Sequence, residues 1–425
     1  MLASSRLIAH RERSPYSGGR KERDINLSRR TRSPLQLFAL AMLAVGLLLA
    51  PGSAQATGTG TVRAWGCGVS NNGQCSVPGG LSGVTAIAAG ALHSVALKSD
   101  GSVVAWGCGT GADFGQCSVP SGLSGVTAVG AGGAQSLALE GNGTVVAWGC
   151  GGGGFGQCSV PSGLSGVTAI AAGALHSLAL KSDGSVVAWG CGSSGDFGQC
   201  SVPSGLAGVR AIAAGFSQSL ALKSDGTVVA WGCGGRSEDD GQCRVPSGLS
   251  GVSAVTAGTY QSLALKQDGT VVAWGCGGAA PQAGQCSVPS GLSGVTAIAA
   301  STFQSMALKR DETVVAWGCG APAPNNGQCR VPGGLSGVTA IAAGGVHSLA
   351  LVVPPPACTV PKVVGKRLAS AKGTIAKRHC RTGTVGHAYS RKRSKGIVLS
   401  QSKRPGRVFP AGSRIDLVVS RGRRR

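Results

Sequence analysis

The sequence predicts an all-β fold, a seven-bladed β-propeller, on the basis of one repeating unit. Fourteen of the 16 cysteines form seven pairs, and each pair follows one of the seven tryptophans. The second cysteine of one pair always lies 33 positions before the first cysteine of the next, as Cys75 does before Cys108. The unit is therefore 41 to 43 residues long, a length typical of one supersecondary unit stacked on its neighbours.

Each unit is predicted to hold four short strands, because its side chains are small or β-branched and show no 3.6-residue periodicity. Asp100-Gly101 supplies the positive φ angles of a tight turn between the second and third strands, and Pro120 ends the fourth. Four strands every forty-odd residues indicate propeller blades. In the first complete unit the strands are residues 84–90, 93–98, 102–107 and 116–120.

The two ends of the repeat array are complementary. Residues 61–67 and 74–78 match a third and a fourth strand, and no first or second strand precedes them. Residues 338–344 and 347–351 match a first and a second strand, and the chain then reaches three prolines. Joining the halves makes the seventh blade and removes both free sheet edges, so we expect a closed ring.

The recurring phrases HSLALKSDGSVVAWG and GQCSVPSGLSGVTAIAAG resemble the regulator of chromosome condensation repeat in its short bacterial form, over residues 59–352. Within that form, repeat length and sevenfold count are most similar to β-lactamase inhibitory protein II, a secreted propeller. The resemblance implies a propeller that binds a protein through one face. It does not imply the same target.

The N-terminal residues resemble an export signal. Arg29, Arg30 and Arg32 precede the apolar run 35–49, and Ala54-Gln55-Ala56 is a small-x-small cleavage site. We therefore expect residues 1–56 to be a signal peptide and the mature protein to be secreted, without a membrane span after cleavage.

An oxidising compartment favours disulfides between the paired cysteines. Each pair lies at the two ends of a predicted hairpin, where facing residues are within disulfide reach. No pair has metal-ligand spacing, and His93, His176 and His347 are replaced by glutamine in the other units, so we expect no metal and no cofactor. The predicted bonds are Cys67–Cys75, Cys108–Cys117, Cys150–Cys158, Cys191–Cys200, Cys233–Cys243, Cys276–Cys286 and Cys319–Cys329.

Composition changes after the prolines. Residues 354–425 hold 19 Lys and Arg against one acid, whereas residues 57–353 hold 11 basic and 12 acidic residues. Residues 358–365, 368–378, 396–402, 405–406 and 415–422 resemble a PASTA domain. The resemblance implies a small α+β domain of one helix on three strands, association with peptidoglycan, and a Cys358–Cys380 bond. The expected organisation is signal peptide 1–56, propeller 57–353, linker 354–357, PASTA-like domain 358–422 and basic tail 423–425.

All loop diversity is predicted to lie on one face of the ring. In an antiparallel blade the loop between strands one and two emerges on the same side as the loop between the paired cysteines. We call this side the cystine-loop face. Aromatic residues on a rigid scaffold favour partner binding. The candidate ligand-binding residues on this face are Phe114, Phe155, Phe197, Phe216, Tyr260, Phe303, Asp113 and Asp196.

The acids of this face include Asp239, Asp240 and Glu238, against Arg236. They lie on glycine-rich loops and lack a partnered His, Ser or Lys constellation, so we expect no catalytic residues and no enzyme activity.

The predicted function is a secreted, cell-envelope-associated binding protein. It recognises an extracellular protein or glycan through one propeller face and attaches to peptidoglycan or an anionic wall polymer through the basic domain. That domain has only Tyr389 and Phe409 as aromatics, so nucleic acid is not expected as a partner. Two alternatives remain open, a soluble inhibitor of an extracellular enzyme and a carbohydrate-active enzyme.

Overall fold

The computed structural model describes residues 54–68, 70–109, 113–151, 154–192, 195–234, 239–277, 283–320 and 326–424. The predicted signal peptide lies outside these residues, apart from positions 54–56 at the start of the first strand.

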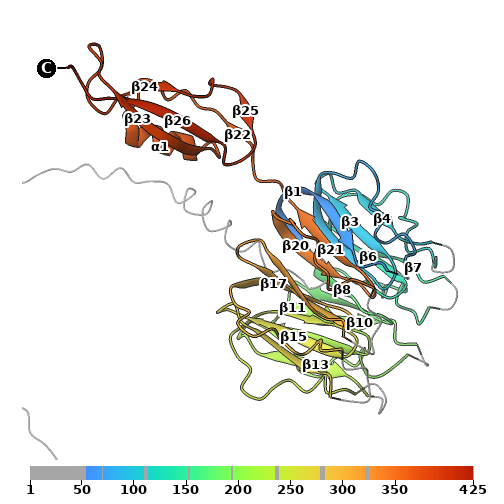
Figure 1. Ribbon diagram of the computed structural model, residues 1–425. Helices are drawn as coiled ribbons and strands as arrows, with labels where there is room; N and C mark the ends of the chain where they lie inside the picture. Colours follow the sequence, from blue (N-terminus) through green and yellow to red (C-terminus); the bar gives the residue numbers. More distant parts are fainter. Residues whose placement is uncertain are drawn as a thin grey trace, which may run out of the picture. The chain divides into compact units, whose positions relative to one another are not determined.

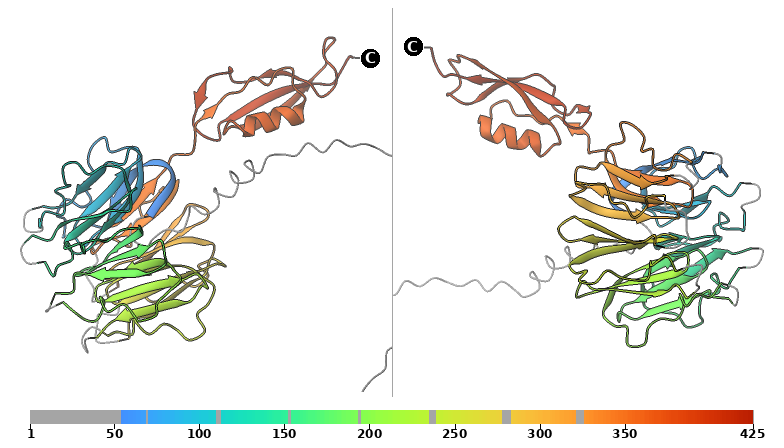
Figure 2. Two further views of the ribbon diagram at one scale, coloured as in Figure 1. Left: turned by 180° about the vertical axis from the view of Figure 1, so that it is seen from behind. Right: turned by 60° about the horizontal axis from the view of Figure 1, so that its bottom comes forward.

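Seven antiparallel blades of three strands each form the larger part of the described residues (Figures 1 and 2). Five of them are separate sheets, and the other two are joined into one six-stranded sheet in which β1 (Ala54–Trp65) pairs with β2 (Val84–Ala89). In the first complete blade, β2 (Val84–Ala89), β3 (Ser94–Lys98) and β4 (Val103–Trp106) pair in chain order. The next five blades repeat this order: β5 (Val126–Ala131), β6 (Gln135–Glu140) and β7 (Val145–Gly149); β8 (Val167–Ala172), β9 (Ser177–Lys181) and β10 (Val186–Trp189); β11 (Val209–Ala214), β12 (Gln218–Lys223) and β13 (Val228–Gly232); β14 (Val252–Ala257), β15 (Gln261–Lys266) and β16 (Val271–Gly275); β17 (Val295–Ala300), β18 (Gln304–Lys309) and β19 (Val314–Gly318).

The seventh blade joins the two ends of the repeat array, as the sequence predicts. β20 (Val338–Ala343) pairs with β21 (Ser348–Val352), and β21 pairs with β1 (Ala54–Trp65). The register runs from Thr61 opposite Val352 to Trp65 opposite Ser348, and Figure 1 shows β1 beside β20 and β21. The ring is closed by strand pairing between segments almost 300 residues apart.

The expected fourth strand of each blade is not a regular strand, and this part of the prediction is wrong. Residues after the cystine loop form turns, with Ser118 N–H donating to Gly115 O at 3.0 Å and Leu123 N–H donating to Pro120 O at 3.3 Å. Pro120 has no N–H to give to a ladder. The segment is instead held by side chains of the following blade, described below.

Seven apolar clusters lie between neighbouring blades, and each contains one tryptophan. In one of them Trp106 packs with Ile87 and with Leu349 and Leu351 of the seventh blade. All of these side chains are at least nine-tenths buried. The tryptophans therefore hold blade to blade.

The C-terminal domain contains one helix on a small sheet. The parallel pair β23 (Arg381–Ala388) and β26 (Arg414–Ser420) is flanked by antiparallel β24 (Val398–Gln401). Its core includes Ala371 and Ile375 of α1 (Leu368–Ala376) against Leu417. A second, two-stranded sheet pairs β22 (Cys358–Thr359) with β25 (Val408–Phe409). Within the described residues no helix is long and apolar enough to cross a membrane.

Candidate functional site

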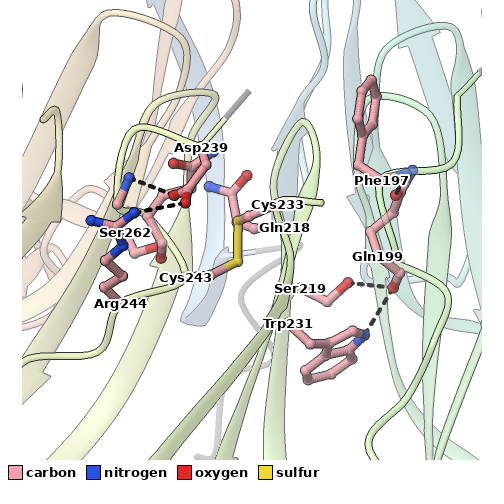
Figure 3. Close-up of a disulfide and its surroundings, with 12 residues drawn as sticks. Phe197, Gln199, Gln218, Ser219, Trp231, Cys233, Asp239, Cys243, Arg244 and Ser262 are labelled. Atoms are coloured by element: carbon pink, nitrogen blue, oxygen red, sulfur yellow. Dashed lines mark hydrogen bonds and ion pairs between the residues drawn. A yellow bond between two sulfur atoms is a disulfide. The ribbon is translucent and has the colours of Figure 1, made fainter. Parts of the chain in front are cut away.

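A recurring set of hydrogen bonds supports the cystine-loop face at the blade junctions, with one departure at Gln157, whose side-chain oxygen has no hydrogen-bond partner among the described residues. In Figure 3, the carbonyl oxygen of Gln199 accepts from Ser219 Oγ and from Trp231 Nε1 of the next blade, each at 2.9 Å. The side-chain oxygen of Gln199 accepts from Phe197 N–H at 2.6 Å. Phe197 O in turn accepts from Gly234 N–H at 2.7 Å. Each loop is therefore fixed to its own blade and to the following one.

Eight disulfides are present, and they are the pairs that the sequence predicts. Seven close the cystine loops and the eighth links Cys358 to Cys380 of the C-terminal domain; no free cysteine is found among the described residues. Figure 3 shows Cys233–Cys243, which joins the end of β13 to the segment that leads into the next blade.

The position that holds His in three blades and Gln in four is a buried link between blades. His93 Nε2 lies 3.0 Å from Ser136 Oγ, and His176 Nε2 lies 2.9 Å from Ser219 Oγ. Gln304 makes the equivalent bond to Ser348 Oγ at 2.6 Å. Burial lowers the pKa of His93 to about 4 and that of His176 to about 3, so these imidazoles are neutral. Each of these imidazoles therefore serves as a neutral hydrogen-bonding link between blades.

The residue at this position, His or Gln, also determines how the cystine loop begins. This difference was not expected from the sequence. Where the blade has glutamine, Gln135 pairs with Gly149 and the ladder gains one residue pair. Cys150 then adopts a φ of 63°. Where the blade has histidine, β4 ends at Trp106 and the ladder begins at Ser94. The His/Gln exchange, visible in the sequence, thus marks two loop geometries.

A cavity of about 620 Å³ opens at the centre of the cystine-loop face. All seven blades line it through the last residue of their first strand, from Ala89 to Ala343. The next position is glycine in six blades, because neighbouring blades approach closely there; a Cβ on Gly132 would lie 2.2 Å from Gly173 O. Ser301 occupies this position in the remaining blade. Among the described residues, the lining contains no Lys, Arg, Asp, Glu or His, so this part of the cavity suits an uncharged group.

The predicted aromatic residues fall into two sets. Phe114, Phe155, Phe216 and Tyr260 line the cavity. Phe303 contacts Tyr260, with ring centroids 5.7 Å apart, without itself lining the cavity. Phe197 lies outside the lining. Phe114 is 41% exposed and is the most accessible large apolar side chain among the described residues of the propeller.

The predicted acids hold turns in the loops. Asp113 Oδ1 accepts from Gly115 N–H, and Asp196 Oδ1 accepts from Gly198 N–H, each at 2.8 Å. Asn71 makes the same bond to Gly73 N–H at 2.9 Å, so an Asx side chain can hold this turn without a charge, and two other blades have Gly154 and Gln282 at the same position.

The other acids of this face differ from one another. Asp239 pairs with Arg244 at 3.0 Å, as Figure 3 shows, and Asp240 is buried. The predicted Glu238 and Arg236 lie outside the described residues.

Four polar residues of the cavity were missed by sequence reasoning. Thr259 Oγ1 donates to Thr302 Oγ1 at 3.2 Å, which places two hydroxyls of adjacent blades together. Gln157 and Ser301 line the cavity, and each has a buried polar side-chain atom without a hydrogen-bond partner among the described residues. The break in the glycine pattern at Ser301 was the one signal in the sequence that singled out this sector.

Comparison with known proteins agrees with this architecture. The model of the regulator of chromosome condensation (RCC1) repeat matches residues 84–116, 167–199 and 209–242, and the PASTA domain model matches residues 359–421. The chain thus contains an RCC1-repeat propeller and a C-terminal PASTA domain. No relative was found among curated protein sequences.

Two solved structures of the yeast RCC1 protein Prp20 show the same fold. Prp20p from Saccharomyces cerevisiae is similar with a TM-score of 0.55 and 20% identity, over 70% of this chain and 93% of that chain. Yeast Prp20 bound to Kap60 gives a TM-score of 0.54 and 20% identity, over 78% of this chain and 96% of that one. At this identity the likeness concerns the fold alone.

Proposed function

We propose that the protein is secreted and acts at the cell envelope as a binding protein. Its propeller recognises a protein or glycan through the cystine-loop face, and its PASTA domain attaches it to peptidoglycan or an anionic wall polymer. Disulfides are typical of oxidising compartments, and eight of them together with a PASTA domain point to an extracellular or wall location.

The observation that carries the binding role is the cavity at the ring centre. It is lined by four aromatic side chains and by small residues, and it lies on the face whose loops vary in length and sequence. The scaffold that holds these loops repeats from blade to blade. The sequences of the loops can therefore vary while the scaffold stays the same. Concave sites lined by aromatic residues and a few polar groups are the usual form of ligand sites.

An RCC1 propeller also serves as a protein-binding scaffold elsewhere, since Prp20p has been described with its binding to Gsp1p and histones. For this chain an extracellular partner fits the proposed compartment better. An uncharged aromatic or aliphatic group, presented by a protein or a glycan, suits the uncharged lining of the cavity.

We also propose that the protein is not an enzyme. Asp113 and Asp196 are occupied in backbone hydrogen bonds of their turns, and the three histidines of the propeller are buried between blades. These arrangements support a structural use of the residues that a hydrolase would need as acid and base.

The test uses isolated cell walls and a ligand array. The full-length oxidised protein is expected to sediment with walls, whereas a chain that ends before residue 354 remains in solution. Both forms are expected to bind the same set of proteins or glycans on the array. Equal release of both forms from the walls would favour the soluble inhibitor instead, and turnover of an arrayed glycan would favour the carbohydrate-active enzyme.

A further inference from the structure

One end of the PASTA domain brings together cations from two segments that are distant in the sequence. Ser390 N–H donates to Gly422 O at 2.9 Å, and Ser420 Oγ donates to Arg393 O at 2.9 Å. The segment that follows β23 therefore lies beside the segment that follows β26. Seven exposed cations make up this region, which we call the basic end: Arg391, Lys392, Arg393, Lys395, Arg421, Arg423 and Arg424.

No ion pair to these seven cations is found among the described residues. The ion pairs found among the described residues all involve residues of the propeller. Asp416 is the single acid after residue 354, and its Oδ1 accepts a 2.7 Å hydrogen bond from Thr384 N–H. A cluster of this density destabilises the domain by self-repulsion unless an anion is bound.

The basic end is ordered by local contacts. The guanidinium groups of Arg421 and Arg424 each lie 5.9 Å from the centre of the Tyr389 ring, a cation–π distance. Ser390 Oγ accepts from Arg393 N–H at 3.1 Å and fixes the turn that carries the first four cations. The arginines are thus arranged beforehand, which reduces the entropy lost on binding.

We propose that the basic end binds a linear phosphodiester polymer of the cell wall. The inference rests on the proposed wall attachment and names its ligand. Five of the seven cations are arginines, whose planar fork matches phosphate oxygens. A polymer with a phosphate in every repeat unit also gains from the release of its counterions.

Other polyanions fit the basic end less well. Tyr389 is its single aromatic residue, 54% exposed and with two guanidinium groups near its ring, so the basic end offers at most one stacking position rather than the series of aromatic platforms typical of single-stranded nucleic acid binding. Residues 390–396 and 420–424 contain no apolar side chain, whereas peripheral membrane binding is typically reinforced by apolar insertion. A dense set of cations with one aromatic residue and no apolar side chain therefore suits a flexible chain of phosphates best.

The test measures binding of poly(glycerol phosphate) to the full-length protein. One variant removes four charges from the basic end, as R391Q/R393Q/R421Q/R423Q. The matched control removes four exposed charges elsewhere in the domain, as K362Q/K372Q/K377Q/R404Q. We expect the first variant to bind at least about 30-fold more weakly and the control to stay within about threefold of the parent. Raising salt from about 50 to 200 mM should weaken the parent at least about tenfold.

Three outcomes would overturn the inference: no binding of the polymer by the parent at low salt, equal loss in both variants, or tighter binding to duplex DNA or to anionic vesicles at equal phosphate concentration. Cell walls from which the phosphate polymer has been removed distinguish the proposed phosphate ligand from the proposed wall attachment. Unchanged sedimentation of the parent with stripped walls would retain wall attachment and reject the phosphate ligand. Binding of the free polymer without sedimentation on any wall would support the phosphate site and reject the attachment.

Discussion

Trp65 donates its indole N–H to the carbonyl oxygen of Gln328, 3.0 Å away and 263 residues later in the chain. Trp189 makes the same bond to Gln157 at 2.9 Å, 32 residues earlier. The junction that closes the ring is therefore built like a junction between consecutive blades. Sequence separation is the main difference between the two bonds.

This equivalence gives a matched test of ring closure. Replacing Trp65 by Phe should lower the free energy of unfolding by about 1 to 2 kcal/mol, and replacing Trp189 by Phe should do the same, because each change removes one buried hydrogen bond. Thermal and denaturant unfolding measure both. An open ring would be indicated if the Trp65 variant were as stable as the parent while the Trp189 variant was not. Deleting residues 58–78 should abolish the cooperative transition, since it exposes a sheet edge.

The cystine loops should each contribute to stability independently. Replacing Cys191 and Cys200 together by Ala should lower the free energy of unfolding by about 2 to 3 kcal/mol. The disulfide restricts a loop with a sequence separation of 9 in the unfolded chain, and its loss restores that conformational entropy. Non-reducing peptide mapping of the parent should yield eight intact disulfides and no thiol. A cross-blade disulfide in that map would contradict the structure.

The buried histidines should make stability depend on pH. In the folded state the pKa of His93 is about 4 and that of His347 about 3, below the ordinary 6.5, because burial disfavours the charged imidazole. The unfolded chain takes up these protons first, so stability falls as pH decreases from about 6.5 to about 4. The melting temperature, followed over that range, should drop accordingly.

Glutamine at the same position in other blades supplies the control. The triple variant H93Q/H176Q/H347Q should fold, since Gln304 already makes the bond to the serine of the next blade. Its melting temperature should be nearly constant between pH 6.5 and 4. The pKa of turn carboxylates such as Asp183 is lowered by hydrogen bonds, in this case from Ser185. Their protonation therefore lowers the stability only at more acidic pH, near and below the ordinary carboxyl pKa of 3.8. A triple variant that kept the full pH dependence of the parent would assign the effect to other groups.

The role of Asp113 can be separated from its charge. Replacing it by Asn should leave stability unchanged, because Asn71 holds the equivalent turn. Replacing it by Ala should cost about 1 kcal/mol or less, for one exposed hydrogen bond. If Asp113→Asn abolished hydrolysis of a glycan, the acid would be catalytic and the proposal of a non-enzymatic role would fail.

The repeat made most of the fold predictable. Spacing alone predicts the seven blades, the cysteine pairs and the joining of the two terminal halves, because each rests on a pattern seen many times in one chain. The fourth strand was the exception. Residues 116–120 alternate like a strand, yet Gln116 O accepts from Trp148 Nε1 of the next blade, a tertiary contact that no local pattern contains.

The site was predictable only at the level of a face. Sequence comparison between blades placed Phe114, Phe216 and Tyr260 on the cystine-loop face, where the structure shows them lining the cavity, but it gave no basis for separating them from Phe197, which lies outside the lining. Whether a loop residue turns toward the ring axis depends on the loop's own geometry. The acids were selected for their charge, whereas the structure uses Asp113 and Asp196 as turn residues.

The most direct test of the account compares the two faces of the ring in one binding measurement. The ligand recovered by the parent is titrated against F216A/Y260A/F303A and against a variant of the opposite face, S124A/S165A. We expect the aromatic variant to lose about 2 kcal/mol or more of binding free energy for each aromatic residue that is a hot spot, with an unchanged melting temperature, and the serine variant to bind as the parent does. Normal binding by the aromatic variant, together with failure of the serine variant, would contradict the assignment of the cystine-loop face.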